Sequence, residues 1–225
     1  PLQASLVGMQ TLDIVIRSRG GHHAALGLAM LAILLGQTSR FRQARKYSSL
    51  AIELSNSPEM PVYLQYRLSL LLYNHLTFHF KPLPGALSDI RKMIPKLISS
   101  GDEEYYALAL YFSLYMGLYA GENLIELSRK ADHAVREVTE LDCLASRSKV
   151  LIQAQLIYNL TTGTAFQHVT FDGPIYTDAL PVEVKRRYND PSLRFDYHLA
   201  SALCAYLFDL PHKAMMSLNA IGLQG

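Results

Sequence analysis

Two histidines, His75 and His79, stand four residues apart in a stretch with helical hydrophobic periodicity. On a helix this spacing brings both imidazoles to one face, the arrangement that two zinc ligands would use. Metalloproteases with paired histidines carry a glutamate directly after the first one, whereas Leu76 follows His75 here. We therefore expect structural histidines and no metal site, with His75 and His79 the only candidates for a metal.

Other sequence patterns for catalysis or cofactor binding are missing. Phe171-Asp172-Gly173 contains the residues of the kinase DFG motif with the first two reversed, and no HRD-type catalytic loop accompanies it. The sequence holds neither a P-loop nor a GxGxxG stretch, so no glycine-rich loop would cradle a nucleotide phosphate. We expect that this segment is not an enzyme and binds no cofactor.

The charges argue against nucleic acid as a partner. The formal net charge is only +2, and binding through many phosphate contacts needs a concentrated basic surface. The densest basic cluster is Lys185-Arg186-Arg187. It is either a solvated helix turn or a docking site for an acidic surface of a neighbouring domain.

The apolar runs are too short for a membrane span. The most apolar one, Ala24 to Leu35, is about twelve residues long, whereas a span needs roughly 20. We expect a buried helix here and no membrane partner. The two cysteines, Cys143 and Cys204, lack the spacing of a zinc or redox pair, which favours a reducing, cytoplasmic location.

Tyrosines crowd one stretch, where Tyr111, Tyr115 and Tyr119 follow one another at helical spacing. Such a stripe either packs in a core or forms a ligand surface, and we expect packing, with the hydroxyls bonded to polar partners. Asn159 lies in another apolar stretch, where a buried amide must find hydrogen bonds; we expect it to brace two helices.

Helical periodicity dominates the chain and predicts an all-α fold. Turn residues such as Arg19-Gly20-Gly21 and Ser100-Gly101 punctuate it. Pro95 should kink or split the helix that contains it. The expected helices are 3–18, 22–37, 40–55, 59–80, 85–100, 102–119, 121–141, 144–161, 190–209 and 211–222.

The exception is a non-helical loop at about 162–190. It carries Phe166, Phe171 and Tyr176 among glycine and proline, and loops of this length in compact domains are usually functional. We expect these residues, with Lys185, Arg186 and Arg187, to form an ordered contact element.

The spacing of small residues indicates degenerate repeats of the tetratricopeptide (TPR) kind. In such repeats small residues stand where the two helices of a pair cross. One candidate repeat matches this pattern and has an aromatic residue at its turn. A second candidate repeat has the small residues at the same spacing, but Pro211 stands where the aromatic residue belongs. The packing residues of the two are Ala32, Phe41, Ala44, Ala51, Ala202 and Ala214. We expect TPR-like antiparallel pairs stacked as an α-solenoid.

Four further segments resemble the helical-repeat region of large multidomain signalling kinases of bacteria and fungi. They are Tyr63 to Phe80, Pro82 to Asp102, Glu104 to Gly121 and Arg194 to Ala214. In that family a serine/threonine-kinase-like domain and an AAA-type ATPase precede the repeats, and a GAF domain and a sensor histidine kinase follow. The resemblance implies that any ATP-dependent protein kinase activity belongs to a longer parent chain, of which residues 1–225 form one repeat domain.

Two functions fit this resemblance. The first is a non-catalytic scaffold that links the ATPase and histidine kinase modules of a two-component signal-transduction protein and contacts neighbouring domains or another protein. The second is a ligand- or peptide-sensing repeat domain of a STAND-type ATPase transcriptional regulator. The neighbouring sequence separates them, since a histidine kinase downstream favours the first and a DNA-binding domain the second.

Overall fold

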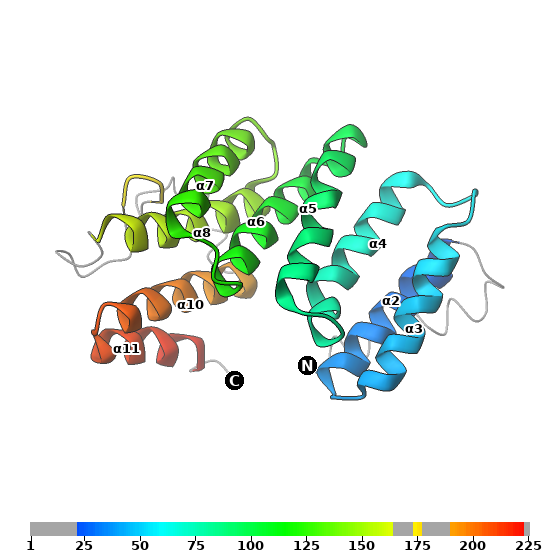
Figure 1. Cartoon of the computed structure of the whole chain (residues 1–225), viewed down its shortest axis with the longest axis horizontal. Helices are drawn as coiled ribbons and strands as arrows, with labels where there is room; N and C mark the ends of the chain where they lie inside the picture. Colours follow the sequence, from blue (N-terminus) through cyan, green and yellow to red (C-terminus); the bar gives the residue numbers. More distant parts are fainter. Residues whose placement is uncertain (1–21, 164–172, 177–189, 223–225) are drawn as a thin grey trace. The chain divides into compact units, whose positions relative to one another are not determined.

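The computed structural model describes residues 22–163, 173–176 and 190–222, and within these ranges all regular elements are helices (Figure 1). The chain divides into two compact units, 1–109 and 110–225. No helix of the described ranges is both long enough and apolar enough to cross a membrane.

The first unit is built from helices joined by short turns. Helix α6, Glu103–Tyr119, begins in this unit and ends in the second, because the division falls after Ala109. The other elements are α2 (His22–Gln37), α3 (Phe41–Ser55), α4 (Val62–His75), the 3₁₀ helix η1 (Thr77–His79) and α5 (Leu83–Ser99).

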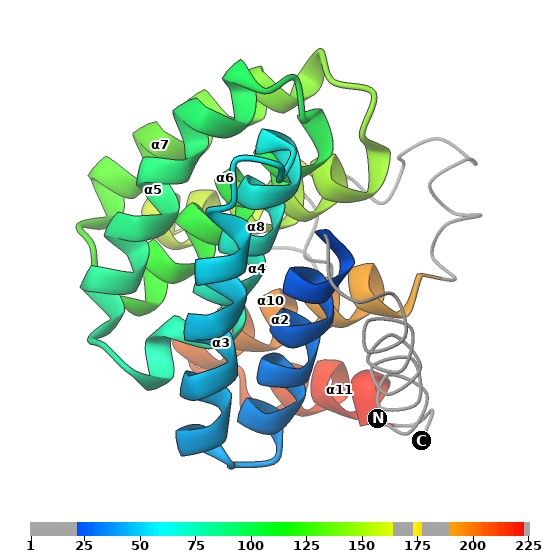
Figure 2. The same ribbon diagram turned by 90° about the vertical axis from the view of Figure 1, so that its right-hand side faces the viewer.

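Among the described residues of the second unit, four helices follow α6 (Figure 2). Helix α7 packs on α8, α8 on α10, and α10 on α11. Their bounds are Leu124–Thr139 for α7, Leu144–Thr162 for α8, Pro191–Leu207 for α10 and Pro211–Gly222 for α11.

The sequence predicted these helices closely, with one correction. The start of every described helix, and the end of every one except α4, lies within three residues of its predicted position. The predicted helix 59–80 was wrong at its end: α4 stops at His75, Leu76 leaves helical geometry at φ −129°, and η1 follows. Helix α5 continues through Pro95, so the expected split does not occur. The predicted helix 3–18 lies outside the described residues.

Local sequence explains the helix ends of the second unit. The Asn123 side chain accepts hydrogen bonds from the backbone N–H groups of Ile125 (3.0 Å) and Glu126 (3.3 Å), which caps the start of α7. Asp190 does the same for α10, ahead of Pro191 at the first helical position. At the end of α8, Gly163 adopts φ +66°, a left-handed conformation that favours glycine.

Alanines dominate the packing of α2 against α3. Ala25, Ala29, Ala32, Ala44 and Ala51 are all completely buried in one core cluster. A methyl group is the smallest side chain that still fills such a space, so alanines at facing positions allow two helix backbones to approach closely. The pair α2–α3 is therefore held by close contact over small side chains.

Of the three remaining predicted repeat residues, two are buried and one is exposed. Ala202 on α10 and Ala214 on α11 are both buried, and these two helices pack on each other. Phe41, expected as the turn aromatic, is the first residue of α3 and is 39% exposed. Its ring lies 4.7 Å, centroid to centroid, from the ring of His79.

An ion pair fixes the start of α6 within the first unit. Arg67 on α4 donates to both carboxylate oxygens of Asp102, at 2.6 Å from Nε and 3.1 Å from Nη2. Its guanidinium also lies over the rings of Tyr63 and Tyr105. The Asp102 carboxylate accepts from the Tyr105 N–H at 3.4 Å, consistent with its expected place at the start of the helix.

We predict that Ala44→Leu lowers the free energy of unfolding by about 1–3 kcal/mol, because a buried crossing position has no room for three more carbon atoms. Urea denaturation measures the change. Gln43→Leu is the matched control, since Gln43 is the exposed neighbour on the same helix, and a surface change of this kind stays within about 0.5 kcal/mol. Equal stability of the two variants would contradict close packing at Ala44.

Candidate functional site

A tyrosine ladder on α6 forms one wall of a hollow in the second unit. Tyr111, Tyr115 and Tyr119 follow at one-turn spacing, with ring centroids 5.9 Å and 4.7 Å apart. Helices α8 and α10 supply the other walls. The lining residues are Tyr111, Tyr115, Tyr119, Gln153, Leu156, Asp196, Leu199, Ala200 and Leu203.

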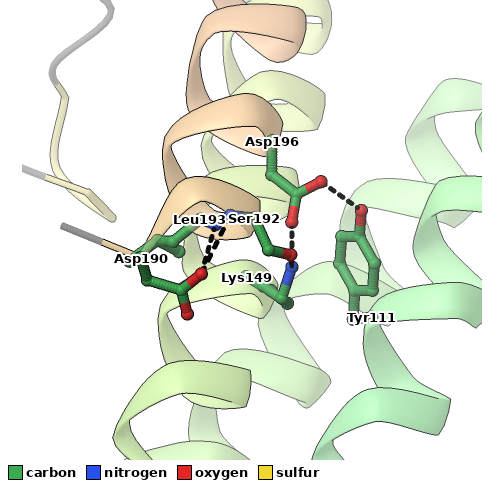
Figure 3. A network of polar contacts seen from close by, with 6 residues as sticks. All are labelled: Tyr111, Lys149, Asp190, Ser192, Leu193 and Asp196. Carbon is green, nitrogen blue, oxygen red and sulfur yellow. Dashed lines mark hydrogen bonds and ion pairs between the residues drawn. The ribbon is translucent and has the colours of Figure 1, made fainter. Parts of the chain in front are cut away.

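A polar network ties the three helices together beside this hollow (Figure 3). Lys149 on α8 forms an ion pair with Asp196 on α10 and donates to the Ser192 hydroxyl at 2.7 Å. Tyr111 donates its hydroxyl hydrogen to the second Asp196 oxygen at 3.1 Å. The side chains of Lys149 and Asp196 are only 15% and 13% exposed. Removing one partner of such a pair leaves a charge in a poorly solvated place.

Burial raises the pKa of two tyrosines of the ladder, Tyr111 and Tyr115. It raises the pKa of Tyr111, and the negative charge of Asp196 raises that pKa further. Burial, together with the neighbouring Tyr119, raises the pKa of Tyr115 to about 12. At neutral pH the hydroxyls are therefore hydrogen-bond donors and acceptors and not nucleophiles.

Two buried glutamines on α8 differ sharply in their hydrogen bonding. The Gln155 oxygen accepts from the backbone N–H groups of Ile175 and Tyr176, each at 3.0 Å, and its nitrogen donates to Asn159 at 2.7 Å. Gln153 is 4% exposed, and its Nε2 has no hydrogen-bond partner among the described residues. An unpaired buried donor costs free energy, and this one belongs to a residue that lines the hollow.

Gln155 also anchors the described part of the predicted contact loop. Tyr176 is 1% exposed and belongs to the core cluster of this unit. A Cβ at Gly173 would clash with the Gln155 amide, so any side chain there would displace this amide from its present position. The predicted contact residues Phe166, Phe171, Lys185, Arg186 and Arg187 lie outside the described residues.

The two candidate metal ligands lie on different elements. His75 ends α4 and His79 ends η1, so the helical spacing that would place both imidazoles on one face is not present. The ring of His79 packs against the rings of Phe41 and Phe78. Within the described ranges, no three His, Cys, Asp or Glu side chains lie together as a metal site.

The hollow is suited to hydrogen bonding and contact rather than to bond making. The ion pair beside it, Lys149 with Asp196, is internally neutral, and the raised pKa values of Tyr111 and Tyr115 keep these two phenols protonated at neutral pH. Leucines and an alanine cover the remaining wall. Its cavity volume is about 10 Å³, room for about one water molecule.

Sequence reasoning found only part of this site. The tyrosine ladder was recognised as a stripe, whereas Lys149, Gln153 and Asp196 were not singled out. A signal for Gln153 existed, because it stands within the apolar run Val150 to Ile157, where a buried amide needs partners. The pairing of Lys149 with Asp196, 47 residues later, has no sequence signal.

Comparison of the chain with known protein families, curated proteins and solved structures gave no match.

We predict opposite effects for the two buried glutamines. Gln153→Met keeps the side-chain volume and removes an unpaired donor, so the free energy of unfolding should stay unchanged or rise. Gln155→Met leaves two backbone N–H groups and the Asn159 oxygen without their partner, and should lower it by about 1–3 kcal/mol. Thermal and urea unfolding of both variants make the comparison. Equal destabilisation would show that Gln153 is paired.

A second prediction concerns alkaline pH. The folded-state pKa values of Tyr111 and Tyr115 lie above the ordinary value near 10, so folding favours the protonated phenols. This contribution is complete below about pH 10 and is lost as the pH rises toward 12. Urea midpoints at pH 8, 10 and 11 should therefore fall more steeply for the unmodified chain than for Tyr111→Phe/Tyr115→Phe. If the urea midpoints of the unmodified chain and of the double variant fell equally with pH, the two raised pKa values would be contradicted.

Proposed function

We propose that this chain is a non-catalytic, TPR-like helical-repeat scaffold that mediates protein contacts within a larger signalling protein. The observation that carries the proposal is the outward face of the last helix pair. On α11, the large apolar side chains Met215, Met216 and Leu218 are 55%, 61% and 43% exposed, whereas Ala214 is the buried residue of that helix.

Helix α7 provides the contrast. It buries Leu127, Ala131, Ala134 and Val138 at helical spacing. Its large exposed apolar side chains, Leu124 and Ile125, lie in the first turn, and charged residues such as Asp132 are exposed along the rest of the helix. That is the usual pattern of a helix at a solvent boundary. Helix α11 instead leaves its large apolar side chains exposed. Large apolar side chains that remain exposed commonly mark interaction sites.

The way helical repeats pack gives a physical reason why α11 leaves large apolar side chains exposed. Each pair in a repeat array contacts its neighbour through larger apolar side chains, after small residues have brought its own two helices together. The pair α10–α11 has buried Ala202 and Ala214, and it leaves Tyr206 and Leu207 exposed on α10 as well. The proposed partner surface is a further helical repeat or a neighbouring module of the same signalling protein.

The resemblance in sequence suggests which modules these are. Within the proposal, the scaffold stands between an AAA-type ATPase and a sensor histidine kinase, and it acts in the cytoplasm. The alternative is a ligand- or peptide-sensing repeat domain of a STAND-type regulator, although the hollow beside the tyrosine ladder is too small to hold such a ligand. The gene sequence downstream distinguishes them, since the scaffold predicts a histidine kinase and the sensor predicts a DNA-binding domain.

A site-specific photo-crosslinker tests the contact face. A benzoylphenylalanine at Met216, in cells that express the protein at its natural level, should give one dominant adduct within the protein or with one partner. The matched control places the crosslinker at Asp132, on the polar face of α7. Adducts of equal yield at both positions, or none at Met216, would rule out α11 as a contact surface.

A further inference from the structure

The outward side of α3, in the first unit, carries cations without counter-charges. Arg42, Arg45 and Lys46 are exposed and stand three and four residues apart, which places them on one side of the helix. None of the three forms an ion pair among the described residues. The first turn of α3 holds no acidic residue, and Arg42 in that turn opposes the helix dipole. The arrangement therefore costs local stability.

The helices around α3 supply no compensating charge. Helices α2 and α4 pack on α3, and neither contains Asp or Glu. The carboxylate of α3 itself, Glu53, stands two turns beyond Lys46. Helix α7 differs, because Asp132 lies three or four residues from both Arg129 and Arg136, which are exposed. The positive charge of α3 is therefore left unbalanced by its own helix and by its neighbours.

An exposed aromatic cluster lies at the start of the same helix. The ring of His79 lies 4.7 Å from that of Phe41 and 4.1 Å from that of Phe78, centroid to centroid. Phe41 and Phe78 are 39% and 43% exposed. Arg45 follows Phe41 by one helical turn, and Ile52, 36% exposed, continues this side of α3. Helix α3 therefore presents apolar side chains next to its cations.

These two features together define the chemistry of a partner. Exposed cations of one sign attract an acidic surface. Nucleic acid fits less well, because its binding rests on many phosphate contacts and the net charge of the whole chain is only +2. Leu50 and Leu54, each 39% exposed, add aliphatic surface that suits the apolar side chains of a protein. An acidic helix with an apolar stripe offers both kinds of contact along α3.

We propose that the outward side of α3 binds an acidic amphipathic helix of a partner protein. Its carboxylates pair with Arg42, Arg45 and Lys46, and its apolar stripe packs on Phe41 and Ile52. The charges steer the partner and set its orientation, and the apolar contact holds it. The inference rests on the proposed role in protein contact and adds a second contact surface, in the first unit.

Fluorescence anisotropy of the purified chain with labelled probes tests this. The acidic amphipathic peptide is Glu-Leu-Asp-Glu-Leu-Phe-Glu-Asp-Leu-Glu-Glu-Leu. One comparison peptide has Gln and Asn in place of Glu and Asp, another has Ser in place of Leu and Phe, and an oligothymidylate of equal length probes nucleic acid. The first peptide should bind about tenfold more tightly than the other three probes, the ratio expected for a few exposed charge pairs. Added salt should weaken its binding.

Arg42→Gln/Arg45→Gln should weaken binding of the acidic amphipathic peptide about tenfold, without loss of thermal stability, since both side chains are exposed. Arg129→Gln/Arg136→Gln removes the same charge from α7 and is the matched control that should keep the affinity. The inference is overturned by no binding, by equal binding of the neutral peptide, by tighter binding of the oligothymidylate, or by equal loss in both double variants. An α11 crosslink that persists in Arg42→Gln/Arg45→Gln would then leave the scaffold function standing, so the two failures are distinguishable.

Discussion

Close packing of helices over alanine side chains is the constraint on which this structure depends. In the pair α2–α3, five alanines are completely buried, and in α10–α11 Ala202 and Ala214 occupy corresponding places. Because a methyl group contributes little apolar area, each pair gains limited hydrophobic stabilisation from its own interface. The larger apolar side chains must then be covered by other elements. Where none of the described elements covers them, as on α11, they stay exposed.

In the second unit, a network of polar side chains adds to the apolar packing of the helices. Lys149, Asp196 and Tyr111 link α8, α10 and α6 through contacts that shield two opposite charges from water. A buried ion pair adds little net stability compared with apolar packing, yet it strongly disfavours arrangements in which either charge is unpaired. It therefore fixes the register of three helices and holds the tyrosine ladder in place beside the hollow.

Gln153 and Gln155 contrast an amide whose nitrogen has no partner among the described residues with a fully bonded structural amide. Both residues lie on α8, two positions apart, and both are buried. Gln155 has partners for its oxygen and its nitrogen, and it holds the segment 173–176. Gln153 lines the hollow, and its Nε2 has no hydrogen-bond partner within the ranges that the structure describes. Hydrogen bonding, rather than burial or residue type, distinguishes their roles.

The sequence by itself determined the helices, because their hydrophobic period, caps and turn residues are local. It predicted α2 from His22 to Gln37 at both ends, and it singled out the small residues Ala32, Ala44, Ala51, Ala202 and Ala214, which the structure buries. It failed at the end of α4, since no local signal marks the break at Leu76; that residue is buried in the core, where tertiary packing decides. The tertiary structure alone brought Lys149 to Asp196 and Gln155 to the backbone of Tyr176, and it left Gln153 Nε2 without a partner among the described residues. These contacts join residues far apart in the chain, and only the packing of whole helices determines which of them meet.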